Sequence, residues 1–412
     1  MRKRSVTLVV LFLLALACGG DNGHDAVPLS DRSHLGVSDT EIRLGILSDE
    51  SGPRKAIGVP RVKAARVFFQ ALNDQGGING RHVRLVVADH QFNPEVAAVK
   101  YREMKDSVVL IEQIYPLAFL RDDLARDGIL ASPVARFSKL AGDPHLLLTG
   151  TPYRIEMSNA VDWLAGTLPD PRRTRIAAVT QADDYGADGL AGIEEAARSH
   201  GLQLVTTLTY QPTDVDFSAQ VAALKASGAD YVFLTTTARV TAKIIEGCAK
   251  VGFAPSFIGT YFSFHPQIIA DNPALKPLFA ARYQASGPFA RWGEDVPGMK
   301  AMLDAITRYA PEQKPDPFFL HGWIQAGIVA EVLERTAETS NLNRQGILNA
   351  LESMPHVDLG GLSPTLSYGR DTGGRPPSQQ TRMFEIAVDD PGYPDMLKPI
   401  TEFYVGDTAA AR

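Results

Sequence analysis

Cysteine is almost absent from this chain of 412 residues, which contains only Cys18 and Cys248. Two cysteines allow at most one intrachain disulfide, and they allow none if Cys18 is modified, so the core alone has to stabilise the fold. Cys248 lies in ARVTAKIIEGCAKVG, where apolar residues recur at helical spacing. We therefore expect a packed core thiol rather than a reactive one.

Long apolar runs are also missing, apart from one at the N-terminus. Arg2-Lys3-Arg4 precedes a stretch, residues 6–17, that is apolar except for Thr7. Such a stretch is too short to span a bilayer, which takes roughly 20 apolar residues. A basic segment followed by a short apolar one is typical of an export signal, so we predict a signal peptide at 1–17 and no membrane-spanning segment in the mature chain.

The residues around Cys18 fit two cleavage schemes. Ala15-Leu16-Ala17 is an A-x-A signal-peptidase site, which would give a secreted protein with an unmodified Cys18. Leu16-Ala17-Cys18 resembles a bacterial lipobox, although Ala15 stands where Leu is usual, and would make Cys18 a lipid attachment residue. The polar segment GGDNGHD after Cys18 suits a tether and favours the lipoprotein. We predict a tether at 18–39 and contact with the membrane through a lipid anchor only.

The sequence has neither an excess of positive charge nor a recognisable catalytic motif. A net charge of -6 and a pI near 5.9, without a cluster of Lys and Arg among aromatics, argue against nucleic-acid binding. G-x-S-x-G, H-E-x-x-H and G-x-x-x-x-G-K-[ST] do not occur, and the histidines lack ligand spacing. Tyr185 beside Asp183 and Asp184 imitates an acid/base pair but suits a hydrogen-bonded wall equally well. We expect no catalytic residue, metal or cofactor.

Alternating strands and helices are what the chain does contain, and residues 42–89 form the first such unit. Ile42, Leu44 and Ile46 alternate as in a strand, Pro60 begins a helical pattern that ends at Gly76, and the β-branched run HVRLVVAD follows. This order predicts a right-handed βαβ crossover. Ligands of open α/β sheets bind beyond the carboxyl ends of the strands, so the loops 48–58 and 89–93 should border a site.

The same alternation continues in two successive sets. Strands are predicted at 108–111, 129–132 and 146–149, and then at 175–180, 203–208, 231–235 and 257–259, with helices at 94–105, 154–164, 189–200, 217–227 and 238–251. Three further helices, at 296–309, 318–337 and 344–354, precede a tail rich in Gly and Pro with short strands. The pattern predicts an α/β protein with two doubly wound, Rossmann-like lobes.

Several segments carry a resemblance to a known family: VSDTEIRLGIL with SGP, LNDQGGINGRHVRLVVAD, ASP at 131–133, DDYGADGL, TDVDFSAQVAALKASGADYVFL and AKVGFAPSFIG. They resemble the type I periplasmic binding proteins, above all the leucine/isoleucine/valine-binding branch. The resemblance implies two lobes joined by hinge strands, a ligand in the cleft and an ABC-type permease of the inner membrane as partner. It places lobe 1 at 40–150 and 287–354, and lobe 2 at 151–286 and 355–412.

The positions that hold an amino acid in that branch differ here. A loop rich in Ser and Thr is replaced by EQIYPLAFL, and Tyr261 stands where an acid would pair with the ligand's ammonium group. The position of a second acid of that branch corresponds to Tyr153 or Arg154 in this chain, so neither expected partner of an ammonium group is evident. An ammonium buried without a carboxylate costs on the order of several kcal/mol. We therefore predict an apolar or aromatic ligand without an α-amino group, and we expect Arg136 to meet its carboxylate if it has one.

The candidate ligand-binding residues are Ser51, Gln113, Tyr115, Ser132, Val134, Arg136, Tyr185, Thr236, Thr237 and Tyr261. Of these, Tyr185, Thr236 and Thr237 are the ones that the resemblance presents as retained from the family. The aromatic residues expected to gather at the cleft are Tyr115, Phe119, Tyr185, Tyr261 and Phe262. Packing beneath loops is the alternative for them. For Arg136 the alternatives are a solvated side chain or a salt bridge to Asp143, and Asp49 and Glu50 are expected to be solvated rather than to face a cation.

The predicted function is that of an extracytoplasmic solute-binding protein that delivers a small molecule to an ABC-type permease. Two alternatives remain: a ligand-sensing receptor component of similar fold, and a true branched-chain amino acid binder. Neighbouring permease and ATPase genes would favour transport, whereas a kinase or regulator gene would favour sensing.

Overall fold

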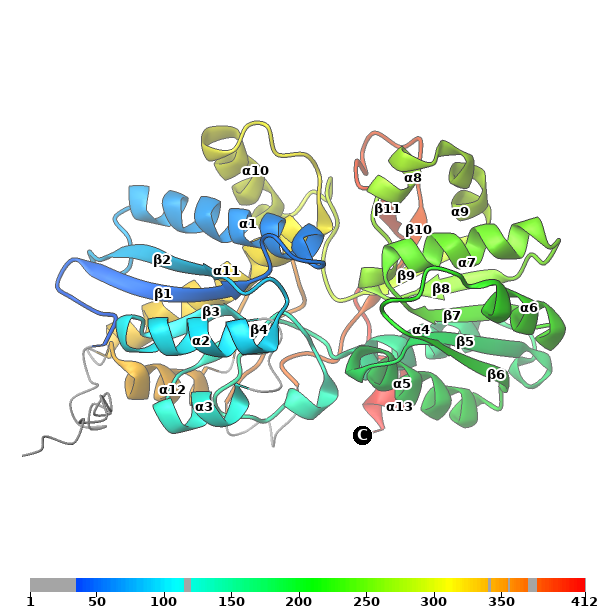
Figure 1. The fold of residues 1–412 in the computed structure, drawn as a ribbon, viewed down its shortest axis with the longest axis horizontal. Helices are drawn as coiled ribbons and strands as arrows, with labels where there is room; N and C mark the ends of the chain where they lie inside the picture. Colours follow the sequence, from blue (N-terminus) through cyan, green and yellow to red (C-terminus); the bar gives the residue numbers. More distant parts are fainter. Residues whose placement is uncertain (1–34, 115–119, 340–341, 355, 370–375, 412) are drawn as a thin grey trace, which may run out of the picture.

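The computed structural model describes residues 35–114, 120–339, 342–354, 356–369 and 376–411. Two β-sheets with their own helices lie side by side (Figure 1). The first sheet has four parallel strands in the order β2 (His82–Asp89), β1 (Glu41–Ser48), β3 (Leu110–Ile114) and β4 (Ala131–Pro133). This arrangement confirms the predicted α/β class and the first βαβ crossover.

Helices cover both faces of the first sheet, as its apolar strands require. Ile42, Leu44 and Ile46 of β1 pack in one cluster with the helices α1 (Lys55–Asp74), α10 (Pro297–Tyr309), α11 (Pro317–Glu338) and α12 (Arg344–Glu352). Leu47 belongs to a second cluster, which α2 (Pro94–Met104) and α3 (Arg121–Asp127) complete. Helices from the last third of the sequence therefore build part of this core.

Two local predictions for the first sheet were wrong. The first helix begins at Lys55, so Pro60 lies inside it and costs one intrahelical hydrogen bond near its start. The segment 146–149 is not a strand, because only an isolated bridge joins Leu146 to Ala131. Both differences concern element ends and short edges, which depend on tertiary contacts more than on local pattern.

The second sheet has seven strands in the order β11 (Leu397–Pro399), β10 (Arg382–Ile386), β9 (Tyr283–Gly287), β8 (Ser256–Gly259), β7 (Tyr231–Thr235), β5 (Arg175–Gln181) and β6 (Gln203–Tyr210). The strands from β6 to β9 are parallel, and β10 and β11 add an antiparallel edge. The sequence analysis did not predict β9, since YQASG is short, contains no β-branched residue and ends in Gly.

Helices cover this sheet on both faces as well. One cluster contains residues of α4 (Tyr153–Thr167) and α5 (Asp184–His200), and the other contains residues of α6 (Ser218–Ser227), α7 (Ala238–Lys250), α8 (Gln267–Asp271) and α9 (Lys276–Arg282). The short helix α13 (Asp407–Ala410) packs on α4. Cys248 is buried in the second cluster, and burial raises the pKa of its thiol to about 12, which confirms a packed core thiol.

The chain passes from one sheet to the other between β4 and α4, between β9 and α10, and between residues 366 and 382. Val357, Leu362 and Leu366 pack in the cluster that contains α1 and α11. The bounds of the two lobes stay a prediction. In the part of the chain that the structure describes, no helix is both long and apolar enough to cross a membrane.

Candidate ligand-binding site

A small pocket of about 80 Å³ lies where the carboxyl ends of strands from the two sheets face each other. Its lining from the first sheet and α1 comprises Arg54, Ile57, Val134, Ala135 and Phe137, and its lining from the second sheet and its helices comprises Tyr153, Gln181, Asp183, Tyr185, Thr237 and Phe262. The position agrees with the rule that ligands of open α/β sheets bind beyond the carboxyl ends of the strands.

Two carboxylates hold the loop between β1 and α1, which carries Arg54 to the pocket. Asp49, which is buried, accepts hydrogen bonds from the backbone N–H groups of Gly52 and Arg54, both at 2.6 Å. Asp89 accepts one from the Ser51 hydroxyl at 2.5 Å. Burial alone would raise the pKa of the Asp89 carboxyl, but this and neighbouring hydrogen bonds outweigh it and lower the pKa. The prediction of a solvated Asp49 was therefore wrong, because its carboxylate is a structural group of this loop.

The opposite wall begins at Asp183, the N-cap residue of α5. One of its oxygens accepts hydrogen bonds from the backbone N–H groups of Tyr185 and Gly186, each at 3.1 Å, and the other accepts one from the Gln181 amide. Gln181 in turn accepts a hydrogen bond from the Tyr210 hydroxyl at 3.1 Å. The polar groups of this wall therefore satisfy one another, and the start of a helix is a favourable place for the Asp183 charge.

Aromatic rings line the remainder of the pocket. Tyr153 contacts Tyr185 edge to face at 4.8 Å between ring centroids, and Phe137 and Phe262 each lie 5.9 Å from Tyr153. The hydroxyl of Tyr185 donates to the backbone carbonyl of Thr236 at 3.0 Å, so protein groups already satisfy the polar end of this ring. The wall that a ligand meets here is predominantly apolar.

Beneath these rings, a buried ion pair joins the two halves of the site. Arg136, which follows β4, pairs with Glu156 of α4 at 3.0 Å, and both side chains are fully buried. The other oxygen of Glu156 accepts the backbone N–H of Tyr261 at 2.7 Å, and the Tyr261 hydroxyl donates to the carbonyl of Pro317 at 2.6 Å. Burial raises the pKa of Glu156 to about 7, although the charge of Arg136 acts in the opposite direction.

The surroundings of Arg136 decide between the alternatives that the sequence left open. Arg136 is not solvated, and its carboxylate partner is Glu156 rather than Asp143, which pairs with Arg121 at 2.5 Å. Its guanidinium lies 4.9 Å from the ring centroid of Tyr153 and so sits behind the aromatic wall. A role for Arg136 in contacting a ligand stays a prediction.

Three of the predicted ligand-binding residues, Val134, Tyr185 and Thr237, line the pocket. Ser51 is exposed on the loop before α1, whereas Gln113, Ser132, Arg136, Thr236 and Tyr261 are buried beneath the site and bonded to other groups. Tyr115, Phe119 and Cys18 lie outside the described residues. The ligand-binding roles of the whole set stay predictions.

Arg54, Ile57, Phe137 and Gln181 also line the pocket, although they were not predicted from the sequence. A signal for the first two existed, because both fall in the loop 48–58 that was expected to border the site. Phe137 and Gln181 follow or end strands of the two sets, so the same rule about carboxyl ends would have included them.

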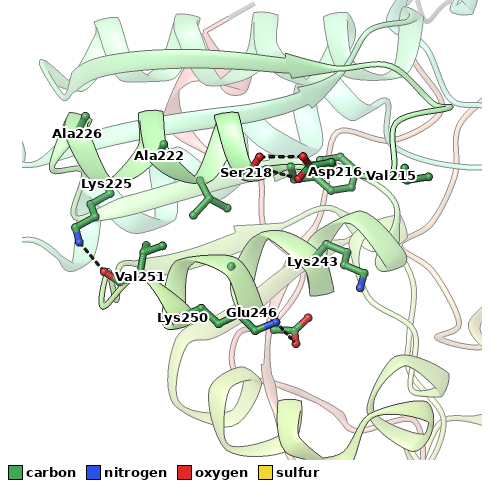
Figure 2. Close-up of a pocket in the computed structure, with 13 residues that line it drawn as sticks. Val215, Asp216, Ser218, Ala222, Lys225, Ala226, Lys243, Glu246, Lys250 and Val251 are labelled. Carbon is green, nitrogen blue, oxygen red and sulfur yellow. Dashed lines mark hydrogen bonds and ion pairs between the residues drawn. The ribbon is translucent and has the colours of Figure 1, made fainter.

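A larger hollow of about 660 Å³ lies on the second sheet's side alone, between α6 and α7 (Figure 2). Its lysines are partly engaged, since Lys225 donates to the carbonyl of Val251 at 2.6 Å and Lys250 pairs with Glu246 at 2.8 Å. It is bordered by helix surfaces and does not include the carboxyl end of a strand. The smaller pocket between the sheets is therefore the candidate site.

Comparison with known proteins identifies the family. The family model described as periplasmic binding protein matches residues 41–391, which is most of the chain. The chain belongs to the periplasmic binding protein family. Members of this family are substrate-binding proteins of ABC transporters, exported to the periplasm, where they bind a small molecule for a permease partner; they are solute-binding transport proteins and not enzymes.

The curated relatives of this chain are distant from it in sequence. The Leu/Ile/Val-binding protein homolog 7 of Brucella abortus is 22% identical over 352 residues, which cover 80% of this chain and 84% of that protein. The leucine-, isoleucine-, valine-, threonine-, and alanine-binding protein of Pseudomonas aeruginosa is 21% identical over 317 residues, covering 74% of this chain and 81% of that protein.

Solved structures superpose on most of the chain. A fatty acid ABC transporter substrate-binding protein from Thermomonospora curvata has a TM-score of 0.83 and 26% identity, and the match covers 92% of this chain and 96% of that one. A branched chain amino acid ABC transporter from Thermus thermophilus with bound valine has a TM-score of 0.77 and 17% identity, over 91% and 99% of the two chains. The type I periplasmic binding protein fold predicted from the sequence is confirmed.

Proposed function

We propose that this periplasmic binding protein captures an apolar or aromatic molecule that carries a carboxylate, and delivers it to an ABC-type permease. The observation that carries this proposal is the lining of the pocket between the sheets. Its apolar contacts come from Ile57, Val134, Phe137, Tyr153 and Phe262. Apolar walls with a few placed polar groups are typical of sites for small organic ligands.

The similarity to the fatty acid substrate-binding protein of Thermomonospora curvata supports the same ligand class. Asp183 is the one carboxylate among the lining residues that the structure describes, and its charge is already compensated by hydrogen bonds and by the start of α5. An α-ammonium group would therefore compete with the existing hydrogen-bond partners of Asp183, whereas an apolar tail would pack against aromatic rings and aliphatic groups.

Binding of a chemical panel tests this proposal. Calorimetry or thermal shift should detect octanoate, phenylacetate or related apolar acids at micromolar concentrations, and leucine and valine should bind much more weakly. Tight binding of leucine or valine, with apolar acids inert, would contradict the proposal.

A branched-chain amino acid is the second candidate ligand. The names of the relative from Pseudomonas aeruginosa and of the valine complex from Thermus thermophilus support this candidate. In addition, Asp183 provides a carboxylate at the pocket surface. Replacing Asp183→Asn distinguishes the two: it should weaken binding of an amino acid strongly, and leave binding of an apolar acid unchanged or slightly stronger.

The proposal extends to membrane attachment and to the lobes. We propose that Cys18 carries a lipid anchor after removal of residues 1–17, that the chain has no enzymatic activity, and that the lobes comprise 40–150 with 287–354 and 151–286 with 355–412. Replacing Cys18→Ala should release the protein from the membrane fraction. A wild-type protein that is already soluble, with an unmodified N-terminal residue, would contradict the anchor.

A further inference from the structure

Of the described residues that line the pocket between the sheets, one is a cation: Arg54, which is half-buried. Among the described residues, no carboxylate lies within ion-pair distance of it, and Asp183 stands on the opposite wall. We infer that Arg54 is the specificity-determining residue that pairs with the carboxylate of the ligand. This inference rests on the proposed function, since it names the group that recognises the ligand's acid.

The loop that carries Arg54 is held in place before any ligand arrives. Asp49 fixes the backbone N–H of Arg54 itself, as described above. The loop also packs closely on its neighbours: a Cβ at Gly58 would overlap the carbonyl oxygen of Asp49, and one at Gly52 would approach that of Gln91 to 2.5 Å. Binding of an anion by Arg54 therefore does not require the loop backbone to become ordered first.

The side chain of Arg54 has a support on its own side of the pocket. Its guanidinium lies 5.6 Å from the ring centroid of Phe92, within the range of a cation–π contact. Gln91 and Phe92 both have positive φ, 55° and 57°, which is unfavourable for residues with a Cβ. Strained backbone of this kind persists where the surrounding structure holds it, and here it carries the ring to Arg54.

The other charged groups at the pocket and the Gln181 amide cannot replace Arg54 as the anion partner. Asp183 would repel a carboxylate, and the Gln181 amide already donates to Asp183. Arg136 has a carboxylate partner in Glu156 and lies behind the ring of Tyr153. An acid that enters with its tail against the aromatic wall therefore meets an available cation at Arg54.

The experiment compares acids with the neutral amides of the same carbon skeleton, octanoate with octanamide and phenylacetate with phenylacetamide, by calorimetry on the full-length protein. Replacing Arg54→Gln should weaken binding of the acid roughly 10- to 100-fold, as expected for one hydrogen-bonded charge pair, and leave the amide unchanged. Arg54→Lys should restore part of the preference for the acid. Lys55→Gln, an exposed neighbour outside the pocket lining, is the matched control and should change neither.

The outcomes separate the inference from the proposed function. If Arg54→Gln weakens acid and amide equally, or weakens neither, Arg54 does not recognise the carboxylate, while acid binding by the wild type still supports the proposed function. If neither acid binds the wild-type protein, the proposed function fails and this inference fails with it. Thermal unfolding of each variant is the control that it remains folded, so that a loss of affinity is not caused by unfolding.

Discussion

The mouth and the base of the site differ in how their polar groups are bonded. At the mouth, the carboxylates that shape the lining accept hydrogen bonds within one half of the molecule, whereas at the base the polar groups connect the two halves. Asp49 and Asp89 hold the loop before α1, and Asp183 caps α5. Two sets of contacts do cross near the mouth: the exposed Lys139–Asp184 ion pair, which contributes little, and hydrogen bonds from the backbone N–H and hydroxyl of Ser138 to Asp188. Because Ser138 and Asp188 are partly exposed, water can replace these hydrogen bonds when the two walls of the mouth separate.

The base of the site consists of bonds that cross between the halves. The Arg136–Glu156 pair links the segment after β4 to α4, and the Tyr261 hydroxyl links the segment after β8 to the start of α11. These groups are buried, so separating them would leave unpaired polar atoms. A mouth that can open over a base that stays together is the arrangement that a hinged closure needs.

The largest effect should come from breaking the pair at the base. Replacing Glu156→Ala leaves Arg136 buried and charged without its partner, which typically costs about 3–5 kcal/mol. Urea unfolding at pH 8 measures this. The control is Glu195→Ala, because Glu195 and its partner Arg154 are partly exposed, and its cost should stay below about 1 kcal/mol. An equal loss in the free energy of unfolding for the two variants would contradict the expected difference between the buried pair and the partly exposed pair.

The same pair should make stability depend on pH. The pKa of Glu156 in the folded protein is about 7, against an ordinary value of 4.5. Between these values the folded protein binds more protons than the unfolded chain, so the free energy of unfolding falls as the pH rises from about 4.5 to 7. Glu112, whose pKa burial raises to about 8, acts in the same direction.

Replacing Glu156→Gln removes the contribution of this group to the pH dependence. The difference in free energy of unfolding between pH 5 and pH 8 should shrink by on the order of 1 to 3 kcal/mol relative to wild type. Urea titrations at several pH values measure the slope. An unchanged slope would mean that Glu156 titrates normally in the folded protein.

A smaller effect is expected for Tyr261→Phe. The variant keeps the ring and removes only the hydroxyl that donates to the carbonyl of Pro317 at 2.6 Å. Loss of one buried hydrogen bond costs about 1 kcal/mol. Hydrogen exchange should become faster on both sides of the lost bond, after β8 and at the start of α11. The comparison is Tyr185→Phe, which loses its bonds to Thr236 and Thr260 and should affect the second sheet's side alone.

The smallest effect should occur at the mouth. Replacing Ser51→Ala removes the hydrogen bond to Asp89, but Asp89 keeps its bonds from the N–H groups of Glu50 and Gln91. The free energy of unfolding should fall by only about 0.5 kcal/mol. Urea unfolding under the same conditions measures this. A loss as large as that of Glu156→Ala would remove the difference between mouth and base.

The periodic pattern of apolar residues predicted most of the fold. Residue pairs that form only when the two halves pack together could not be predicted from the sequence. Strands such as β5 and β7 follow from local pattern. Helix α5 was predicted from Gly189, but it begins at Asp184 with Asp183 as its cap, so its first turn was wrongly assigned to a loop. The Arg136–Glu156 pair does not follow from local pattern, because a lone Arg and a Glu in a helix each suit a solvated surface, and only the packing of the two halves buries both. For the same reason the sequence did not indicate Glu156 as the partner of Arg136, and Arg54 was not singled out as a lining residue in a loop rich in Gly and Pro.

The volume of the pocket has a kinetic consequence. About 80 Å³ is well below the roughly 300 Å³ or more of a typical ligand site, so an acid of eight carbons cannot enter until the walls move apart. Capture then includes an opening step whose rate does not depend on ligand concentration. In stopped-flow fluorescence, the observed rate constant should therefore level off as the acid concentration rises, and that plateau reports how often the two halves open.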